Sequence, residues 1–135
     1  MKLFFSFLLL LCLTGAATAQ QTKTVALPMP YYLKMIDSTS SMDIVFMLGQ
    51  GGSISIEGRN THVVNKFFDW QTTPKLNVPQ AGTIMWEIDG KEFLSGSFYL
   101  GDSTGCLVIN KNGKEYVNKI NATGTSFLKS QGKKQ

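Results

Sequence analysis

The chain has 135 residues, 43% of them hydrophobic, and its 13 lysine and arginine residues against 9 aspartate and glutamate residues give a net charge of +4. This length predicts a single domain that can bury a core without cross-links. Four of the basic residues are Lys2, Lys129, Lys133 and Lys134, so residues 20–128 carry nine basic and nine acidic side chains. Because nucleic-acid binding requires lysine and arginine clustered on one folded face, this distribution excludes a nucleic-acid partner.

The N-terminus contains, in order, the three parts of a secretory signal peptide. Lys2 precedes an apolar run over residues 3–13, and residues 14–19 are small side chains ending in an Ala-x-Ala motif before Gln20. The apolar run is shorter than the ~20 residues that a membrane span requires. We therefore predict a signal peptide over residues 1–19 and a mature chain without an integral membrane segment.

Cysteine usage indicates the compartment and the kind of organism. Cys12 leaves with the signal peptide, so the mature chain keeps only Cys106 and cannot form an internal disulfide. Small secreted animal domains usually depend on disulfides, which favours a bacterial protein that is secreted or located in the periplasm or cell envelope. A lipoprotein signal at Cys12 is the alternative, but Leu11 departs from the small residues that precede such a cysteine. The apolar setting of Cys106 predicts a buried, inert thiol, with pairing between chains left open.

The first half of the mature chain alternates apolar and polar residues, which predicts strands. Pro28 and Pro30 indicate that the first strand lies at a sheet edge or ends there. The five consecutive apolar residues 44–48 are typical of a strand covered on both faces. We predict strands over residues 24–29, 31–36, 43–48 and 53–57, a bulged or two-sided strand over 61–70, and a long connection over 71–82.

The second half is a succession of predicted hairpins. Asp89-Gly90 and Asn112-Gly113 each separate two alternating segments, and both pairs predict tight turns with positive φ angles. Gly96 predicts a β-bulge. The predicted strands cover residues 83–88, 93–100, 106–109 and 115–120, with a short final strand over 125–128.

Short strands at this spacing predict an all-β fold. We expect a single-domain antiparallel β-sandwich or closed barrel of about eight or nine strands over residues 20–128. A basic polar C-terminal tail over residues 129–135 follows it. The pattern does not separate the sandwich from the barrel, and no motif identifies a protein family.

The ionisable residues give little support to catalysis. His62 is the single histidine, without the clustered ligands of a metal site or a nucleophile motif. Met29, Met35, Met42 and Met47 offer thioethers to Cu(I), but no histidine accompanies them, which favours packing in a core. We therefore expect no cofactor, no metal ion and no enzymatic activity.

Aromatic residues are the strongest functional signal. Several are adjacent in sequence, such as Tyr31-Tyr32 and Phe98-Tyr99, and neighbours on a strand point to opposite faces. Rings on the outer face would then form an adhesive surface for a protein or a glycan. The candidate ligand-binding residues are Tyr32, Trp70, Trp86 and Tyr99.

These observations predict an exported, non-catalytic β-domain that binds a partner through exposed aromatic residues or through a sheet edge. The alternative is a small antiparallel barrel that carries a small apolar ligand in a cavity lined by Trp86 and Phe98. The sequence leaves the oligomeric state open.

Overall fold

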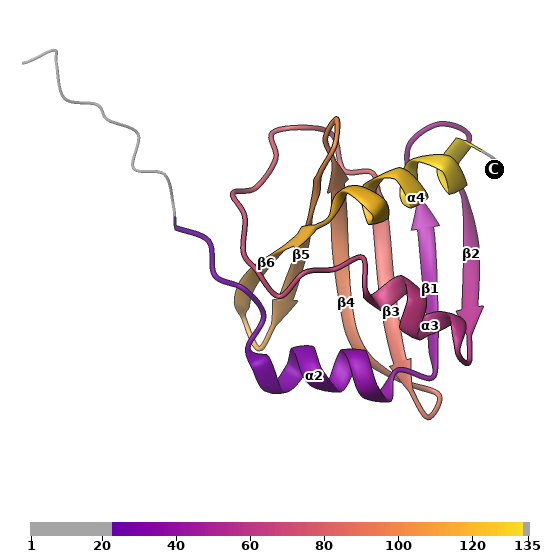
Figure 1. The fold of residues 1–135 in the computed structure, drawn as a ribbon, viewed down its shortest axis with the longest axis vertical. Helices are drawn as coiled ribbons and strands as arrows, with labels where there is room; N and C mark the ends of the chain where they lie inside the picture. Colours follow the sequence, from indigo (N-terminus) through magenta and orange to yellow (C-terminus); the bar gives the residue numbers. More distant parts are fainter. Residues whose placement is uncertain (1–22, 134–135) are drawn as a thin grey trace, which may run out of the picture.

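The computed structural model describes residues 23–133 of the chain, which form six strands and three helices (Figure 1). The predicted signal peptide and its cleavage before Gln20 lie outside the described residues. The helices are α2 (Met29–Ser38), α3 (Asn60–Asn65) and α4 (Ala122–Lys133). The strands are β1 (Ser41–Phe46), β2 (Gly52–Glu57), β3 (Gly82–Ile88), β4 (Lys91–Leu100), β5 (Gly105–Lys111) and β6 (Lys114–Ile120).

The six strands form one open antiparallel sheet in the order β2-β1-β3-β4-β5-β6. The prediction of a mostly β, antiparallel fold is confirmed. The closed barrel is wrong, because β2 and β6 are the two edges of the sheet and do not pair with each other. Six strands replace the expected eight or nine, since three predicted strands are helices and the predicted strand over residues 24–29 is not a strand of the sheet. Residues 23–133 contain no second sheet to complete a sandwich.

One face of the sheet is apolar and packs against the helices, which lie together on that side (Figure 1). Ile44, Ile84, Gly96 and Ile109 stand opposite one another across four neighbouring strands, and helix side chains complete this core. The other face is open over much of its area, since Val45 of β1 is 45% exposed. The prediction that β1 is covered on both faces is therefore wrong, and the molecule has two layers.

Helix α2 replaces the predicted strand over residues 31–36. Pro30 lies in its first turn, where a backbone N–H has no helical acceptor and the fixed φ of proline suits a helix. Met35 is fully buried, and Tyr32 and Ile36 pack beside it against the core, as the spacing of one helix face requires. Tyr31 and Tyr32 are thus neighbours on a helix, so they do not occupy two faces of a sheet.

Helix α3 replaces the first part of the predicted strand over residues 61–70. Thr61, Val64 and Asn65 are buried while Val63 is exposed, which is the pattern of a short amphipathic helix. The poor alternation of this segment reflects helical spacing.

Helix α4 replaces the predicted strand over residues 125–128. Asn121 caps it, because the side-chain Oδ1 accepts a hydrogen bond from the backbone N–H of Gly124 at 2.9 Å. The helix continues to Lys133, so residues 129–133 of the predicted tail are helical.

Gly96 does not form the predicted bulge. It pairs in regular register with Ile84, and the irregularity in the β3–β4 ladder lies between Trp86 and Glu87. A Cβ atom at position 96 would lie 2.9 Å from the carbonyl oxygen of Val108. Close approach of the neighbouring strand therefore explains this glycine.

The free edge of β6 is covered by two extended segments from elsewhere in the chain. The backbone N–H of Val117 donates to the carbonyl of Val25, and that of Lys119 donates to the carbonyl of Gln71, both at 2.8 Å. The predicted strand over residues 24–29 is therefore an extended segment beside β6 that passes into α2 at Met29.

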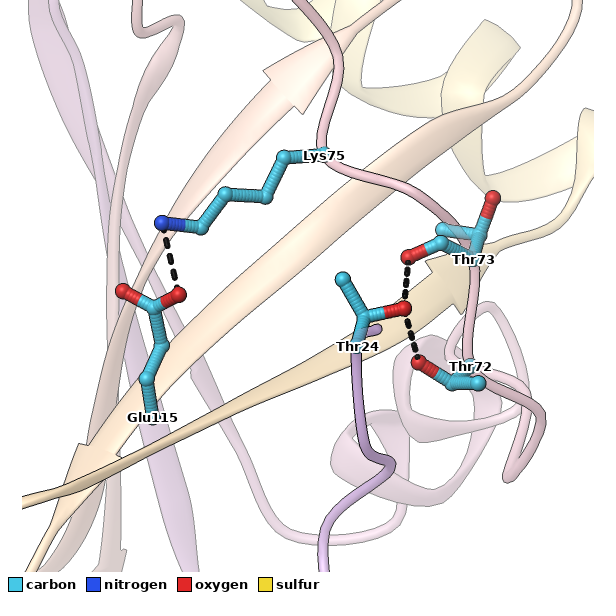
Figure 2. A network of polar contacts seen from close by, with 5 residues as sticks. All are labelled: Thr24, Thr72, Thr73, Lys75 and Glu115. Atoms are coloured by element: carbon cyan, nitrogen blue, oxygen red, sulfur yellow. Dashed lines mark hydrogen bonds and ion pairs between the residues drawn. The ribbon is translucent and has the colours of Figure 1, made fainter. Parts of the chain in front are cut away.

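Polar side chains join these covering segments to each other (Figure 2). The hydroxyl of Thr24 donates to the carbonyl of Thr73 and lies 2.9 Å from the hydroxyl of Thr72. Lys75 forms an ion pair with Glu115 of β6, with Nζ and Oε1 2.6 Å apart. Because this ion pair is about half exposed, it adds little to stability, and the backbone hydrogen bonds hold the edge.

The long connection predicted over residues 71–82 is present up to residue 81, since Gly82 begins β3, and it crosses from one face of the sheet to the other. After α3 the chain reaches the β5–β6 end of the sheet before it returns to β3 (Figure 1). On the helix-free face, Leu76 packs against a small buried cluster of Cys106, Val108 and Val117.

Two buried asparagines connect the layers. Oδ1 of Asn65 accepts a hydrogen bond from Nε1 of Trp86, and its Nδ2 donates to the carbonyl of Met35, both at 2.9 Å. Asn118 accepts from the N–H of Leu27 at 2.8 Å and donates to the carbonyl of Asp69 at 2.9 Å. Each amide therefore joins three separate segments of the chain.

Both predicted tight turns are confirmed by their backbone angles. Asp89 and Gly90 have φ values of 51° and 78°, and Asn112 and Gly113 have φ values of 54° and 75°. A Cβ atom at position 113 would meet no other atom within 4 Å, so a substitution there tests the backbone alone.

We predict that Gly113→Val lowers the free energy of unfolding by about 1 kcal/mol or more, because a β-branched residue resists positive φ. Urea denaturation followed by circular dichroism measures the change. Gly113→Asn is the matched control. Its free energy of unfolding should fall by less than that of Gly113→Val, since asparagine tolerates positive φ. Equal midpoints for the valine variant and the wild type would contradict the turn.

Candidate functional site

The four predicted ligand-binding residues do not form one site. Trp86 is fully buried in the core, where its ring packs edge-on against that of Phe68 with the ring centroids 5.5 Å apart. Its indole N–H donates a hydrogen bond to Oδ1 of Asn65. Trp70 is 48% exposed on the connection between α3 and β3. Tyr99 lies half-buried on the helix-free face, beside the Cys106 cluster.

Tyr32 is half-buried on α2 and serves the fold. Its hydroxyl donates a hydrogen bond to the carbonyl of Phe68 at 2.8 Å. Burial raises the pKa of this hydroxyl above its ordinary value, and the charge of Asp69 raises it further. The tyrosine is therefore a neutral donor at physiological pH, and it ties α2 to the segment after α3.

The residues with possible nucleophilic or acid–base chemistry lie apart from one another. Cys106 is fully buried, and burial raises the pKa of its thiol more than the Leu76 backbone hydrogen bond and nearby Lys75 lower it. His62 is exposed on α3, with Nδ1 3.1 Å from the carbonyl of Ile36. In the described part of the chain, no three His, Cys, Asp or Glu residues gather in a group that could hold a metal ion.

An apolar groove of about 430 Å³ opens between the β1–β2 loop and the C-terminal half of α4. Its apolar lining comes from core side chains and from one exposed loop residue, Leu48. The apolar lining residues are Phe46, Leu48, Ala81, Leu100 and Leu128. The groove therefore reaches from solvent to the edge of the core.

Two glycines keep the loop and the helix close together at this groove. Gly49 has a φ of 73°, which lets the chain turn back after β1, and a Cβ there would lie 3.7 Å from the carbonyl oxygen of Gly132. A Cβ on Gly132 would in turn lie 3.3 Å from the ring of Phe46. Larger residues at these two positions would narrow the groove.

The polar lining of the groove is basic. Lys129 and Lys133 line it from one side of α4, four residues apart, and Gln50 lines it from the loop. Nζ of Lys129 also donates to the carbonyl of Asp102 at 3.1 Å. No acidic side chain lines the groove itself, and the acidic residue nearest to these lysines in the lining of a neighbouring hollow is Asp102.

Sequence reasoning missed this site because its parts are distant in the chain. The available signal in the sequence is that two apolar residues, Met47 and Leu48, directly precede a glycine-rich loop, and both are exposed in the structure. The sequence pattern predicts a polar tail for Lys129 and Lys133, although their spacing of four is that of one helix face.

Three other hollows are less suited to a ligand. One of about 440 Å³ lies beside α4 and shares Lys129 and Lys133 with the groove, but its other lining residues are mainly small and polar, and they include the acidic Asp102. A depression of about 200 Å³ on the helix-free face is lined mainly by small polar residues such as Thr83, Ser95 and Ser97. This volume is below the ~300 Å³ of a usual ligand pocket. A wider hollow of about 780 Å³ lies at the β6 edge, but its Lys75 and Glu115 side chains already pair with each other (Figure 2).

We predict that Cys106 of the folded protein reacts with iodoacetamide at least about 100-fold more slowly than Cys106 of the protein in urea. The reason is that burial keeps the reagent away from the sulfur and disfavours the reactive thiolate form. Because the folded pKa lies above the ordinary 9.0, the folded state holds this proton more tightly. The contribution of the protonated Cys106 thiol to the free energy of unfolding is complete below the pKa of this thiol in the unfolded chain. It is lost as the pH rises through the pKa of the thiol in the folded chain. Rapid alkylation of the native chain near pH 7, measured by mass spectrometry, would contradict the buried thiol.

Within residues 23–133, no helix has both the length and the apolar character needed to cross a membrane. A scan of protein-family models, a search of curated proteins and a search of solved structures each found no match.

Proposed function

We propose that this chain is an exported, non-enzymatic binding protein whose ligand is a single acyl chain with an anionic head. The ligand would lie in the groove between the β1–β2 loop and α4. The observation that carries the proposal is the combination of an apolar lining with two lysines and no acidic residue. The volume of about 430 Å³ is within the ~300–1,000 Å³ of small-molecule sites.

The apolar lining favours an acyl chain over a glycan. Each methylene group that leaves water gains about 0.8 kcal/mol, and among the lining residues Leu48 and Leu100 offer exposed apolar surface for such groups. The hydroxyl groups of a sugar would lose hydrogen bonds to water against the same surface, at a cost of about 1–3 kcal/mol for each unpaired group.

The two lysines favour an anionic head on that chain. Lys129 and Lys133 are one helical turn apart, so both ammonium groups can approach one carboxylate at the rim of the groove once Nζ of Lys129 leaves the carbonyl of Asp102. The same lysines also oppose the negative end of the α4 dipole, which accounts for part of their placement.

Two observations support binding without catalysis. The Cys106 thiol is buried and its pKa is raised, which disfavours a nucleophilic thiolate. The His62 imidazole lies on another part of the surface from the groove and bonds to a backbone carbonyl. Neither group can act on a ligand in the groove.

An aromatic adhesive surface has less support than the groove. Trp86 is in the core and Tyr32 is bonded within the fold, which leaves Trp70 as the one ring among the four candidates that is largely exposed. A single exposed ring is common on soluble proteins.

We predict that decanoate binds the wild-type chain in isothermal titration calorimetry and that Leu48→Gln weakens binding by about tenfold, or about 1.4 kcal/mol. The reason is that a polar amide replaces a side chain lining the groove. Met47→Gln is the matched control, since Met47 is the preceding exposed residue but does not line the groove, and it should leave affinity unchanged.

The charge of the head is tested with the double variant Lys129→Gln/Lys133→Gln. It should reduce affinity for decanoate to that of decanol, and it should leave affinity for decanol unchanged. Absence of decanoate binding, or binding that depends on Trp70 and not on Leu48, would contradict the proposed site.

A further inference from the structure

The two edges of the sheet are treated differently by the rest of the chain. The β6 edge is covered by the segments that contain Val25 and Gln71, as Figure 2 shows for their polar side chains. At the other edge, no element of residues 23–133 pairs with the outer side of β2. In Figure 1, β2 accordingly forms the outer border of the sheet.

The backbone groups that β2 presents outward follow from its register with β1. Gly58 donates its N–H to the carbonyl of Ser40, and antiparallel strands bond to one neighbour at every second residue. Ile56 and Ile54 therefore bond to β1, with which they pair at Met42 and Ile44. The N–H and C=O groups of the three alternate residues point away from the sheet; these residues are Ser53, Ser55 and Glu57.

We infer that β2 pairs with β2 of a second copy of this chain, antiparallel, about a two-fold axis through Ser55. In this register Ser55 faces Ser55 of the second copy, and Ser53 faces Glu57. Each outward-pointing N–H of the three residues then donates a hydrogen bond to an outward-pointing C=O of the second copy, and each outward-pointing C=O accepts one. The two six-stranded sheets become one continuous sheet with a self-complementary interface.

The side chains on both faces of this junction are compatible with the register. On the helix side Ile54 meets Ile56 of the second copy, and both isoleucines are only partly buried in the single chain. On the other side Ser53 meets Glu57 of the second copy, so no like charges stand opposite each other. Helix α3, on which Val63 is 57% exposed, contacts β2.

The β2 edge also lacks the features by which sheet edges avoid pairing. Gly52–Glu57 contains no proline and no lysine, and its pairing with β1 is free of a bulge. The pattern of two isoleucines between serines fits a strand with one apolar and one polar face. A second copy is favoured over an unrelated peptide because β2 matches itself in this register. Its outward N–H and C=O groups meet each other, Ile54 faces Ile56, and Ser53 faces Glu57.

Disulfide trapping with full-length chain tests the register directly. In the proposed dimer the Cα atoms of the two Ser55 residues lie about 5.5 Å apart, within the range that a disulfide spans. We predict that Ser55→Cys forms a cross-linked dimer under mild oxidation at least about tenfold faster than Ser53→Cys, whose two copies lie about 13 Å apart. All chains in this experiment also carry Cys12→Ser, so that buried Cys106 is the one native thiol and the chain with serine at position 55 is an uncrosslinked baseline.

Sedimentation equilibrium tests the backbone pairing without a cross-link. Ser55→Pro removes an outward-facing N–H without removing a bond to β1, so it should raise the dimer dissociation constant at least about tenfold. Ser55→Ala keeps that N–H and should leave the dissociation constant within about twofold.

Three results would overturn the inference. These are a wild-type chain that stays monomeric up to about 1 mM, equal cross-linking of the two cysteine variants, or a Ser55→Pro variant that dimerises as well as wild type. The groove between the β1–β2 loop and α4 is not part of this interface. Decanoate binding by Ser55→Pro therefore reports on the groove separately, so failure of one proposal leaves the other standing.

Discussion

The hydrogen bonds of Asn65 are the interaction on which the two-layer arrangement depends. This buried amide accepts from the indole of Trp86 on β3 and donates to the carbonyl of Met35 on α2, while its own backbone belongs to α3. An indole N–H in an apolar core is costly unless an acceptor is supplied, and α3 supplies it. The short helix is therefore fixed above the sheet by a polar contact inside the core. With α2 and α3 fixed in this way, the helix layer covers only one face of the sheet.

A single covered face explains both proposed sites. The helix layer ends where α4 meets the β1–β2 loop, and the gap left at that margin is the apolar groove. The segment before α2 and the segment after α3 both cover the β6 edge, through backbone hydrogen bonds to Val25 and Gln71. The outer side of β2 therefore has no neighbouring strand among the described residues. The helix-free face needs less cover, because serine, aspartate and threonine side chains occupy it on three neighbouring strands, for example Ser55 on β2, Asp43 on β1 and Thr83 on β3.

The sequence predicts those parts of the fold that depend on local signals. Asp89-Gly90 and Asn112-Gly113 define their turns through positive φ, and the strands around them alternate clearly. The helices escaped prediction because they are short and rich in β-branched or aromatic residues, which suit either structure; Val63-Val64 on α3 is the clearest case. The groove could not be predicted, since Leu48 and Lys133 come together only when α4 packs beside the β1–β2 loop. The sequence analysis expects Trp86 to bind a ligand, because the sequence does not show that the side chain of Asn65 accepts a hydrogen bond from the indole N–H inside the core.

The most direct test of this account is the stability of Asn65→Leu in urea denaturation. Leucine is similar in size but offers the Trp86 N–H no acceptor and the Met35 carbonyl no amide donor. We expect the free energy of unfolding to fall by about 2–4 kcal/mol, whereas Asn60→Leu, on the exposed start of the same helix, should change it by less than about 0.5 kcal/mol. A loss for Asn65→Leu no larger than that of Asn60→Leu would contradict the claim that this amide holds the two layers together.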